Sequence, residues 1–241
     1  MFGFETVKQV KWILVQQKFY CHFFYFYDMT KSSEYTAKLD LVQNEVIRFL
    51  KPLGFKKKGR TFNRESEKGI WQVINIQSGQ FPIGDNHVVL GLRENLYGKF
   101  TVNLGVFVQE LYDIRFPSRP IKTIHEYDCH FRTRLSTITK GYDFWWDFRI
   151  EPEEVAKEII ELLNQKGIPW LDLSGTREKI FENWNKVEGR SPRAKLDVAL
   201  IYLQTDREQG ERLFQQYFNE LSMEPHRGYV LELAKELNIH L

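Results

Sequence analysis

The feature that most constrains the fold is a strict alternation of residue types between Phe100 and Val108. The even positions of this segment are apolar and carry Phe100, Val102, Leu104, Val106 and Val108. The odd positions between them carry Thr101, Asn103, Gly105 and Phe107. An alternation of period two is typical of a β-strand that has one face on a core and one polar face in water. An antiparallel sheet readily provides this arrangement, so the segment predicts one.

Other segments of the chain predict further strands of the same sheet. Residues 128–135 and 143–148 both alternate between apolar and polar side chains. Residues 61–65 and 70–77 read as two more strands, and the break at Glu67-Lys68-Gly69 reads as the hairpin turn between them. A strand, helix, strand alternation does not occur in the sequence, so nothing supports a parallel sheet.

Helical patterns lie on both sides of these strands. From Ser33 onward, apolar residues at steps of three and four predict an amphipathic helix that Pro52 and Gly54 end. A second helix is predicted from Pro152, with Gly167 as its cap. From residue 174 onward four helices are predicted, the second beginning at Ser191-Pro192, the third at Asp206 and the fourth at Pro225. The predicted fold class is α+β, an antiparallel sheet with flanking helices followed by an all-helical C-terminal extension.

Residues 1–28 differ sharply in composition from the remainder. Ten of these 28 residues are aromatic, against 26 of the other 213. Charged residues such as Lys8, Lys11 and Lys18 interrupt any run long enough to span a membrane, and a signal-peptide cleavage site is lacking. We therefore expect residues 1–28 to be a non-core extension, with the true start at Met29. The expected division is this extension, an α+β domain over residues 29–172 and a helical extension over residues 173–241.

Composition excludes several classes of protein. The chain has 34 Lys and Arg against 32 Asp and Glu, and a net charge of +2 argues against nucleic acid as a partner. The run Lys56-Lys57-Lys58-Gly59-Arg60 is the one segment suited to a phosphate backbone. A chain with 42% hydrophobic and 27% charged residues is too polar for a membrane bundle.

The cysteines and the absent motifs narrow the chemistry further. Two cysteines, Cys21 and Cys129, fit a reducing compartment, so we expect a cytoplasmic protein. Neither a metal-ligand spacing nor a glycine-rich phosphate loop occurs in the sequence, so we predict no metal site and no cofactor. Cys129 is expected to be a buried apolar residue rather than a nucleophile, because its own strand face offers no base.

The strongest polar set in the sequence consists of Asp128, His130, Arg132 and Arg134. Alternation along one strand places all four side chains on the same face. An imidazole between a carboxylate and two guanidiniums suits proton transfer on an anionic substrate. The competing interpretation is an ordinary solvated sheet face with cross-strand ion pairs.

Four more residues are predicted to lie around this set. The expected neighbours are Gln77, Asn103 and Asp143, since alternation turns Asn103 away from the apolar side of its strand. The pair Trp145-Trp146 places one indole inward and the other outward. The outward Trp145 is then either an interface anchor or a residue that packs under the helical extension.

Several stretches together carry a resemblance to a known family. They are Leu53-Gly-Phe-Lys-Lys-Lys-Gly-Arg-Thr-Phe62, Val73-Ile-Asn-Ile-Gln77, Phe100-Thr-Val-Asn-Leu-Gly105 and Asp128-Cys-His-Phe-Arg-Thr-Arg134, followed by Trp145-Trp146. In this order they resemble the bacterial domain-of-unknown-function family 4304 over roughly residues 33–172. The resemblance implies an intracellular bacterial α+β domain and assigns no activity, cofactor or catalytic residue. It also implies that a toxin-neutralising immunity role or a defence role is conceivable.

Two functions from different classes follow from these observations. The first is a binding module that presents its polar Arg, His and Trp sheet face to a protein partner. The second is a small hydrolase or transferase acting on an anionic substrate, with His130 as general base and with Arg132 and Arg134 stabilising charge. Because the sequence contains no recognisable catalytic motif, the first hypothesis is preferred.

Overall fold

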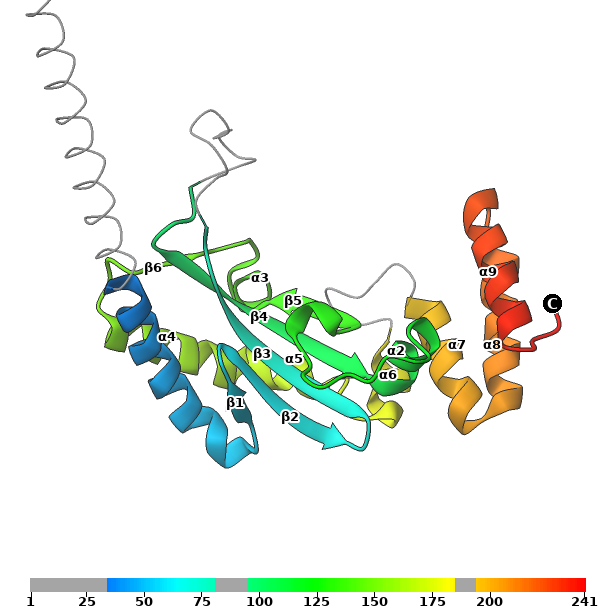
Figure 1. The fold of residues 1–241 in the computed structure, drawn as a ribbon, viewed down its shortest axis with the longest axis horizontal. Coiled ribbons are helices and arrows are strands. Elements are labelled where there is room, and N and C mark those ends of the chain that lie inside the picture. The colour runs from blue at the N-terminus through cyan, green and yellow to red at the C-terminus, as the bar shows by residue number, and fades with distance from the viewer. Residues whose placement is uncertain (1–33, 81–94, 185–193) are drawn as a thin grey trace, which may run out of the picture.

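The centre of the molecule is a six-stranded antiparallel sheet, which confirms the predicted α+β class (Figure 1). The structure is a computed structural model that describes residues 34–80, 95–184 and 194–241. The predicted extension 1–28 and the predicted helix start at Ser191-Pro192 lie outside these residues. The strands follow the order β1-β2-β3-β4-β5, and β6 pairs with β4 beyond the end of β5. Their bounds are β1 Lys56–Lys58, β2 Thr61–Glu67, β3 Ile70–Ser78, β4 Lys99–Val108, β5 Phe131–Arg134 and β6 Trp146–Asp147.

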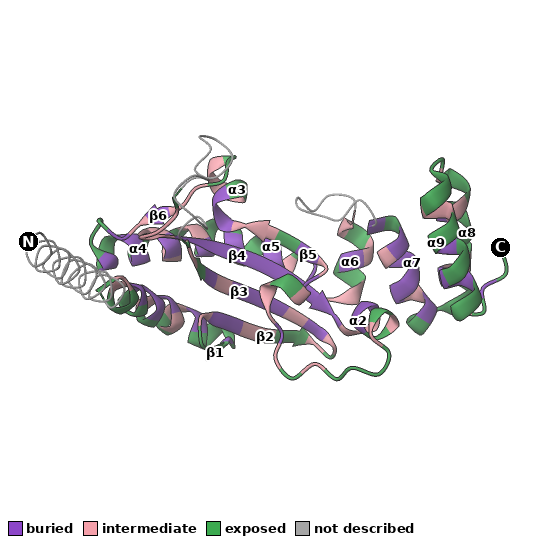
Figure 2. Cartoon of the chain, turned by 45° about the horizontal axis from the view of Figure 1, so that its top comes forward, coloured by how far each residue is buried: buried purple, intermediate pink, exposed green. Residues whose placement is uncertain are grey.

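The central strand β4 is buried on both faces, as Figure 2 shows, which corrects the expectation of one solvated face. Its even-numbered side chains belong to the main core, together with those of β3. On the other face Phe107 packs with Val73, Tyr112 and Ile124 in a second, smaller cluster. The physical reason is that the chain turns back after β4, through helix α2 (Gln109–Arg115) and the short helix η3 (Glu126–Asp128), and covers this face.

Helices cover the face that carries the main core. A helix over residues 34–50 contributes Leu39, Val42, Val46 and Leu50, and the short helix η1 (Lys51–Leu53) follows it. The left-handed Gly54, with φ of +88°, ends this segment as predicted. The helix α4 (Pro152–Leu162) packs beside it through Val155, Ala156 and Ile159.

Gly167 does not end the helix that begins at Pro152, contrary to prediction. The chain continues through a π-helical turn, η4 (Leu163–Gly167), into α5 (Ile168–Asp172). The π turn ends two residues before Pro169, a residue that lacks the N–H an α-helix would use. A Cβ at Gly167 would lie 2.8 Å from Leu163 Cδ2, so glycine serves close packing here rather than a left-handed turn.

Two predicted strands are shorter in the structure than their sequence patterns. The segment 128–135 is a strand only over Phe131–Arg134, because Asp128 lies in η3 and Leu135 begins the helix α3 (Leu135–Lys140). The carboxylate of Asp128 accepts the backbone N–H of His125 at 2.9 Å. Such local capping competes with strand pairing. The segment 143–148 pairs with β4 only at Trp146–Asp147.

The C-terminal region is entirely helical among its described residues, as predicted. It contains α6 (Arg177–Asn183), α7 (Ala194–Thr205), α8 (Arg207–Glu220) and α9 (Glu224–Glu236). Asp206 caps α8 by accepting the N–H of Gln209 at 3.1 Å. Across the described parts of the chain, every helix is too short or too polar to cross a membrane.

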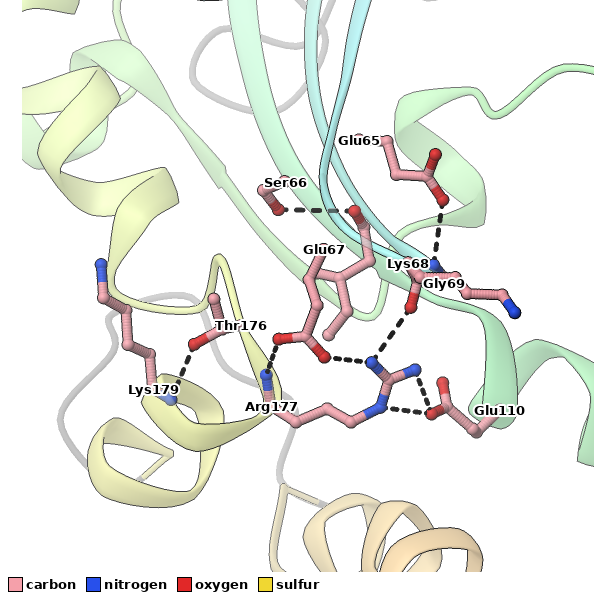
Figure 3. A network of polar contacts seen from close by, with 10 residues as sticks. Glu65, Ser66, Glu67, Lys68, Gly69, Glu110, Thr176, Arg177 and Lys179 are labelled. Carbon is pink, nitrogen blue, oxygen red and sulfur yellow. Dashed lines mark hydrogen bonds and ion pairs between the residues drawn. The ribbon is translucent and has the colours of Figure 1, made fainter.

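Arg177 joins the first C-terminal helix to the sheet (Figure 3). Its guanidinium forms ion pairs with Glu67, at the β2–β3 hairpin, and with Glu110 of α2. It also donates to the carbonyl oxygen of Lys68 at 3.0 Å. Burial opposes the charge, but the hydrogen bonds to Glu110 and Glu67 raise the pKa of Arg177 above its ordinary value. The hairpin, α2 and α6 are therefore held together by one side chain.

Candidate functional site

A cleft of about 1020 Å³ lies between the edge of the sheet and the C-terminal helices. The sheet side of the cleft carries three arginines, Arg115 from α2 and Arg132 and Arg134 from β5. The helical side carries three acids, Asp197 from α7 and Glu232 and Glu236 from α9. The sheet side also carries Glu126, which pairs with Arg132, so the two walls differ in the sign of their net charge.

His130 lines this cleft and is partly buried. Its Nδ1 accepts the backbone N–H of Val108 at 3.1 Å, so the neutral ring carries its proton on Nε2. Burial, and to a smaller extent the charge of Arg115, lowers the pKa of His130 to about 4. At neutral pH the imidazole is therefore uncharged, and its one available function is that of a hydrogen-bond donor.

Arg134 contacts two of the residues predicted to lie near it, Asp143 and Trp145. It forms an ion pair with Asp143, and its guanidinium carbon lies 5.2 Å from the ring centroid of Trp145. The indole nitrogen of Trp145 also donates to Asp143 at 3.5 Å. The three side chains form one cation–π and ion-pair cluster between the end of β5 and the segment before β6.

Two amide side chains, Gln77 and Asn103, also line the cleft next to β5. Asn103 Nδ2 donates to Gln77 Oε1 at 2.8 Å, and both side chains line the cleft. In the β4–β5 register Asn103 lies opposite Arg134. Arg132, two residues before Arg134 and opposite Gly105, forms an ion pair with the carboxylate of Glu126. The strand pairing thus brings together residues that are far apart in sequence.

The predicted polar set is assembled except for one member. His130, Arg132 and Arg134 line the cleft, but Asp128 caps the backbone at His125 instead of sharing their strand face. The expectation that Asp128 is placed beside His130 by strand alternation is therefore wrong, because the strand begins only at Phe131.

A comparison of the sequence with protein families identifies the family of this chain. The family described as Domain of unknown function (DUF4304) matches residues 46–173, which is more than half of the chain. The chain belongs to this family. The DUF4304 match confirms the resemblance expected from the sequence and runs from the helix 34–50 to just beyond α5. No curated protein and no solved structure matches the chain significantly.

The extent of the DUF4304 match divides the cleft in two. Arg115, His130 and the β5 arginines lie inside residues 46–173, whereas α7 and α9 with their acids lie after them. The basic wall thus belongs to the family domain, and the acidic wall is formed by helices beyond the match.

Sequence reasoning did not identify Arg115, Glu126 or the three acids of the helical wall. The sequence offered one signal for Arg115, which is its spacing of one helical turn from Leu111. In the structure both residues line the cleft. No helix was predicted over Gln109–Arg115, so the position of Arg115 at the end of α2 was missed. The acids offered no comparable signal, since their position depends on how separate helices pack.

Cys129 is buried beside the cleft, as expected. Burial first, and then the negative charges of Glu126 and Asp128, raise the pKa of its thiol well above the ordinary value. The thiol therefore stays protonated and is unsuited to act as a nucleophile. Among the described residues, no three His, Cys, Asp or Glu side chains gather in a group suited to hold a metal ion.

Replacing Gly105 by alanine is expected to lower the free energy of unfolding by about 1–3 kcal/mol, the usual cost of overpacking. A Cβ at Gly105 would lie 2.6 Å from Cys129 Sγ and 2.7 Å from Cys129 Cβ. Urea denaturation followed by circular dichroism measures the loss. Adding Cys129→Ala should not restore stability, because the Cβ of that residue clashes as well.

The matched control for this prediction is Gly228→Ala in the interior of α9. A Cβ there has nothing within 4 Å, so only helix propensity changes, and a gain of about 1 kcal/mol is expected. Equal stability of Gly105→Ala and the unmodified protein would contradict the close approach of Cys129 to β4.

Proposed function

We propose that the protein is a binding module whose cleft receives an extended segment of a protein partner. The observation that carries this proposal is the position of the cleft, which reaches the edge strand β5 and has walls of opposite charge. The site includes seven of the eight residues proposed from the sequence: Gln77, Asn103, His130, Arg132 and Arg134 in the lining, and Asp143 and Trp145 beside Arg134.

The two edges of the sheet differ in a way that supports docking at β5. An edge strand presents backbone N–H and C=O groups to which an extended peptide can add as a further strand. At the opposite edge, β1 consists of three exposed lysines, Lys56, Lys57 and Lys58, which is a common protection against strand addition. At β5, by contrast, Thr133 and the nearby Thr137 line the cleft, so an incoming segment has space beside the strand.

The charges of the cleft favour a polypeptide over a nucleic acid. On the helical wall of the cleft Glu232 is paired with Lys235, and the carboxylate of Glu236 would repel a phosphate backbone. A polypeptide can carry acidic side chains toward the arginine wall and basic side chains toward the acidic wall. Trp145, held against Arg134, adds the aromatic surface that binding sites for proteins commonly use.

The alternative, a hydrolase or transferase with His130 as general base, is less well supported. The cleft provides room for a substrate, but Nδ1 of His130 is occupied by the Val108 N–H, and Nε2 carries the proton. A ring whose pKa is about 4 is also a weak base at neutral pH. These contacts suit a hydrogen-bond donor better than a proton acceptor.

We further propose that this binding takes place in the bacterial cytoplasm. This setting rests on what the family resemblance implies and on the cysteine usage of the sequence. There the protein partner would be a toxin that the module neutralises, as in an immunity or defence role.

Photocrosslinking tests the proposed function. A benzoylphenylalanine at Thr133, beside the β5 edge, is expected to trap one defined protein in native cells, which mass spectrometry identifies. The same group at Lys57, on the protected β1 edge, serves as the matched control and should not trap it. Trapping at both positions with equal yield would contradict docking at β5.

Variants of the cleft complete this experiment. The double variant Arg132→Glu with Trp145→Ala should abolish the Thr133 crosslink. Lys195→Glu is the control, because it reverses one charge of a surface ion pair with Glu220 outside the cleft. Persistence of the crosslink in the double variant would exclude the cleft as the binding site.

A further inference from the structure

One arginine of the cleft differs from the other two in its partners. Arg132 is paired with Glu126 and Arg134 with Asp143, so their charges are compensated within the protein. Within the described ranges Arg115 forms neither an ion pair nor a hydrogen bond, and its recorded contact is with the Phe116 ring, 5.2 Å from the guanidinium carbon. Arg115 therefore offers an uncompensated guanidinium to the cleft.

A second donor accompanies this guanidinium. Because the Val108 N–H occupies Nδ1 of His130, the ring has a fixed tautomer with its N–H at Nε2. Its ring also packs on Phe107, with 5.5 Å between the centroids, which restrains the orientation of the imidazole. Arg115 and the ring both line the cleft, and the positive charge of Arg115 helps to lower the pKa of His130.

We propose that Arg115 and the Nε2–H of His130 form a carboxylate-binding position that anchors an acidic side chain of the protein partner. The inference rests on the proposed function and specifies which chemistry the partner segment presents at this end of the cleft. One guanidinium and one neutral N–H match the two oxygens of a carboxylate, and a charge-assisted hydrogen bond from arginine is among the strong ones.

The composition of the cleft selects a carboxylate over a phosphate. A phosphate carries nearly two negative charges at neutral pH, while this position supplies one positive charge. Of the acids on the opposite wall, Glu232 is paired with Lys235, and Glu236 increases the repulsion of a dianion more than that of a monoanion. A basic residue next to the acidic one in the partner would face these acids favourably.

Titration of the full chain with small probes tests this position. The probes are the blocked tripeptide acetyl-Ala-Glu-Ala-amide, its glutamine analogue and inorganic phosphate, and the readout is the NMR signal of the His130 ring. The glutamate peptide is expected to shift this signal saturably. Arg115→Gln should weaken the binding about tenfold, because it removes the charged donor.

The matched control is Arg119→Gln. Arg119 also lies over the Phe116 ring, at 5.8 Å, but it does not line the cleft, so its loss should leave the titration unchanged. Equal binding of the glutamine peptide, preferential binding of phosphate, or no response to any probe would each overturn the carboxylate position.

The peptide titration and the Thr133 crosslink test the carboxylate position and the proposed function separately. If the Thr133 crosslink forms while the glutamate peptide fails to bind, the carboxylate position is excluded and the binding module stands. If the peptide binds while the crosslink fails, the position stands as a small-anion site and docking of a protein at β5 is excluded.

Discussion

Replacing Trp146 by alanine is expected to lower the free energy of unfolding by about 3–5 kcal/mol, the range for a fully buried tryptophan. Trp146 is inaccessible to solvent, and its ring packs on Phe100 and Phe144 at centroid distances of 5.9 and 5.4 Å. The indole N–H also donates to Glu158 Oε2 at 2.9 Å. The substitution therefore creates a cavity and removes a hydrogen bond, and urea denaturation measures the sum of both effects.

The neighbouring Trp145 provides the control for this substitution. Its recorded contacts are with Arg134 and Asp143 at the surface, so Trp145→Ala should cost less than about 1 kcal/mol. A similar loss for both tryptophans would contradict the assignment of one indole to the core and the other to the rim of the cleft. A small loss for Trp145→Ala would also show that this substitution does not unfold the protein in the crosslinking experiment.

Acidification is expected to destabilise the protein through His130. The pKa of this ring is lowered from 6.5 to about 4 in the folded state. Between these two values the unfolded chain binds a proton that the folded chain does not bind, so stability falls as the pH decreases through this interval. The stability that His130 contributes is complete above about pH 6.5, and its loss approaches about 3 kcal/mol near pH 4.

The measurement compares the pH dependence of two proteins. The free energy of unfolding is determined between pH 7.5 and about 4 for the unmodified chain and for His130→Gln, whose amide oxygen can still accept the Val108 N–H. The variant should show a shallower decrease with falling pH, and the difference between the two curves isolates His130 from the other titrating groups. Parallel curves would show that the ring is not protected from protonation in the folded protein.

The sheet illustrates what can be predicted from sequence and what cannot. Alternation between Phe100 and Val108 identified β4 because a strand's two faces follow directly from residue order. Whether the second face meets water depends on the segment after β4 folding back over Phe107, and this is a tertiary contact without a local signal. The solvated face was therefore the natural expectation, and it was wrong for that reason.

The same distinction holds for the site. Asn103 and Arg134 were placed together correctly because both point to one face of paired strands. Asp128 was misplaced because a carboxylate can bind a nearby backbone N–H and end the strand pattern early. The acids of α7 and α9 were out of reach, since their approach to β5 is decided by helix packing across the whole chain.

The lysines of β1 have a consequence for how many molecules can join one sheet. One edge of the sheet, β1, carries three exposed cations, Lys56, Lys57 and Lys58. Lysines on an edge strand oppose the addition of another strand, so the β1 edge of one copy would not receive the β5 edge of the next, which opposes head-to-tail growth into an open fibre. A partner segment added at β5 would occupy the one edge that can accept a strand. Each molecule would therefore bind a single partner segment.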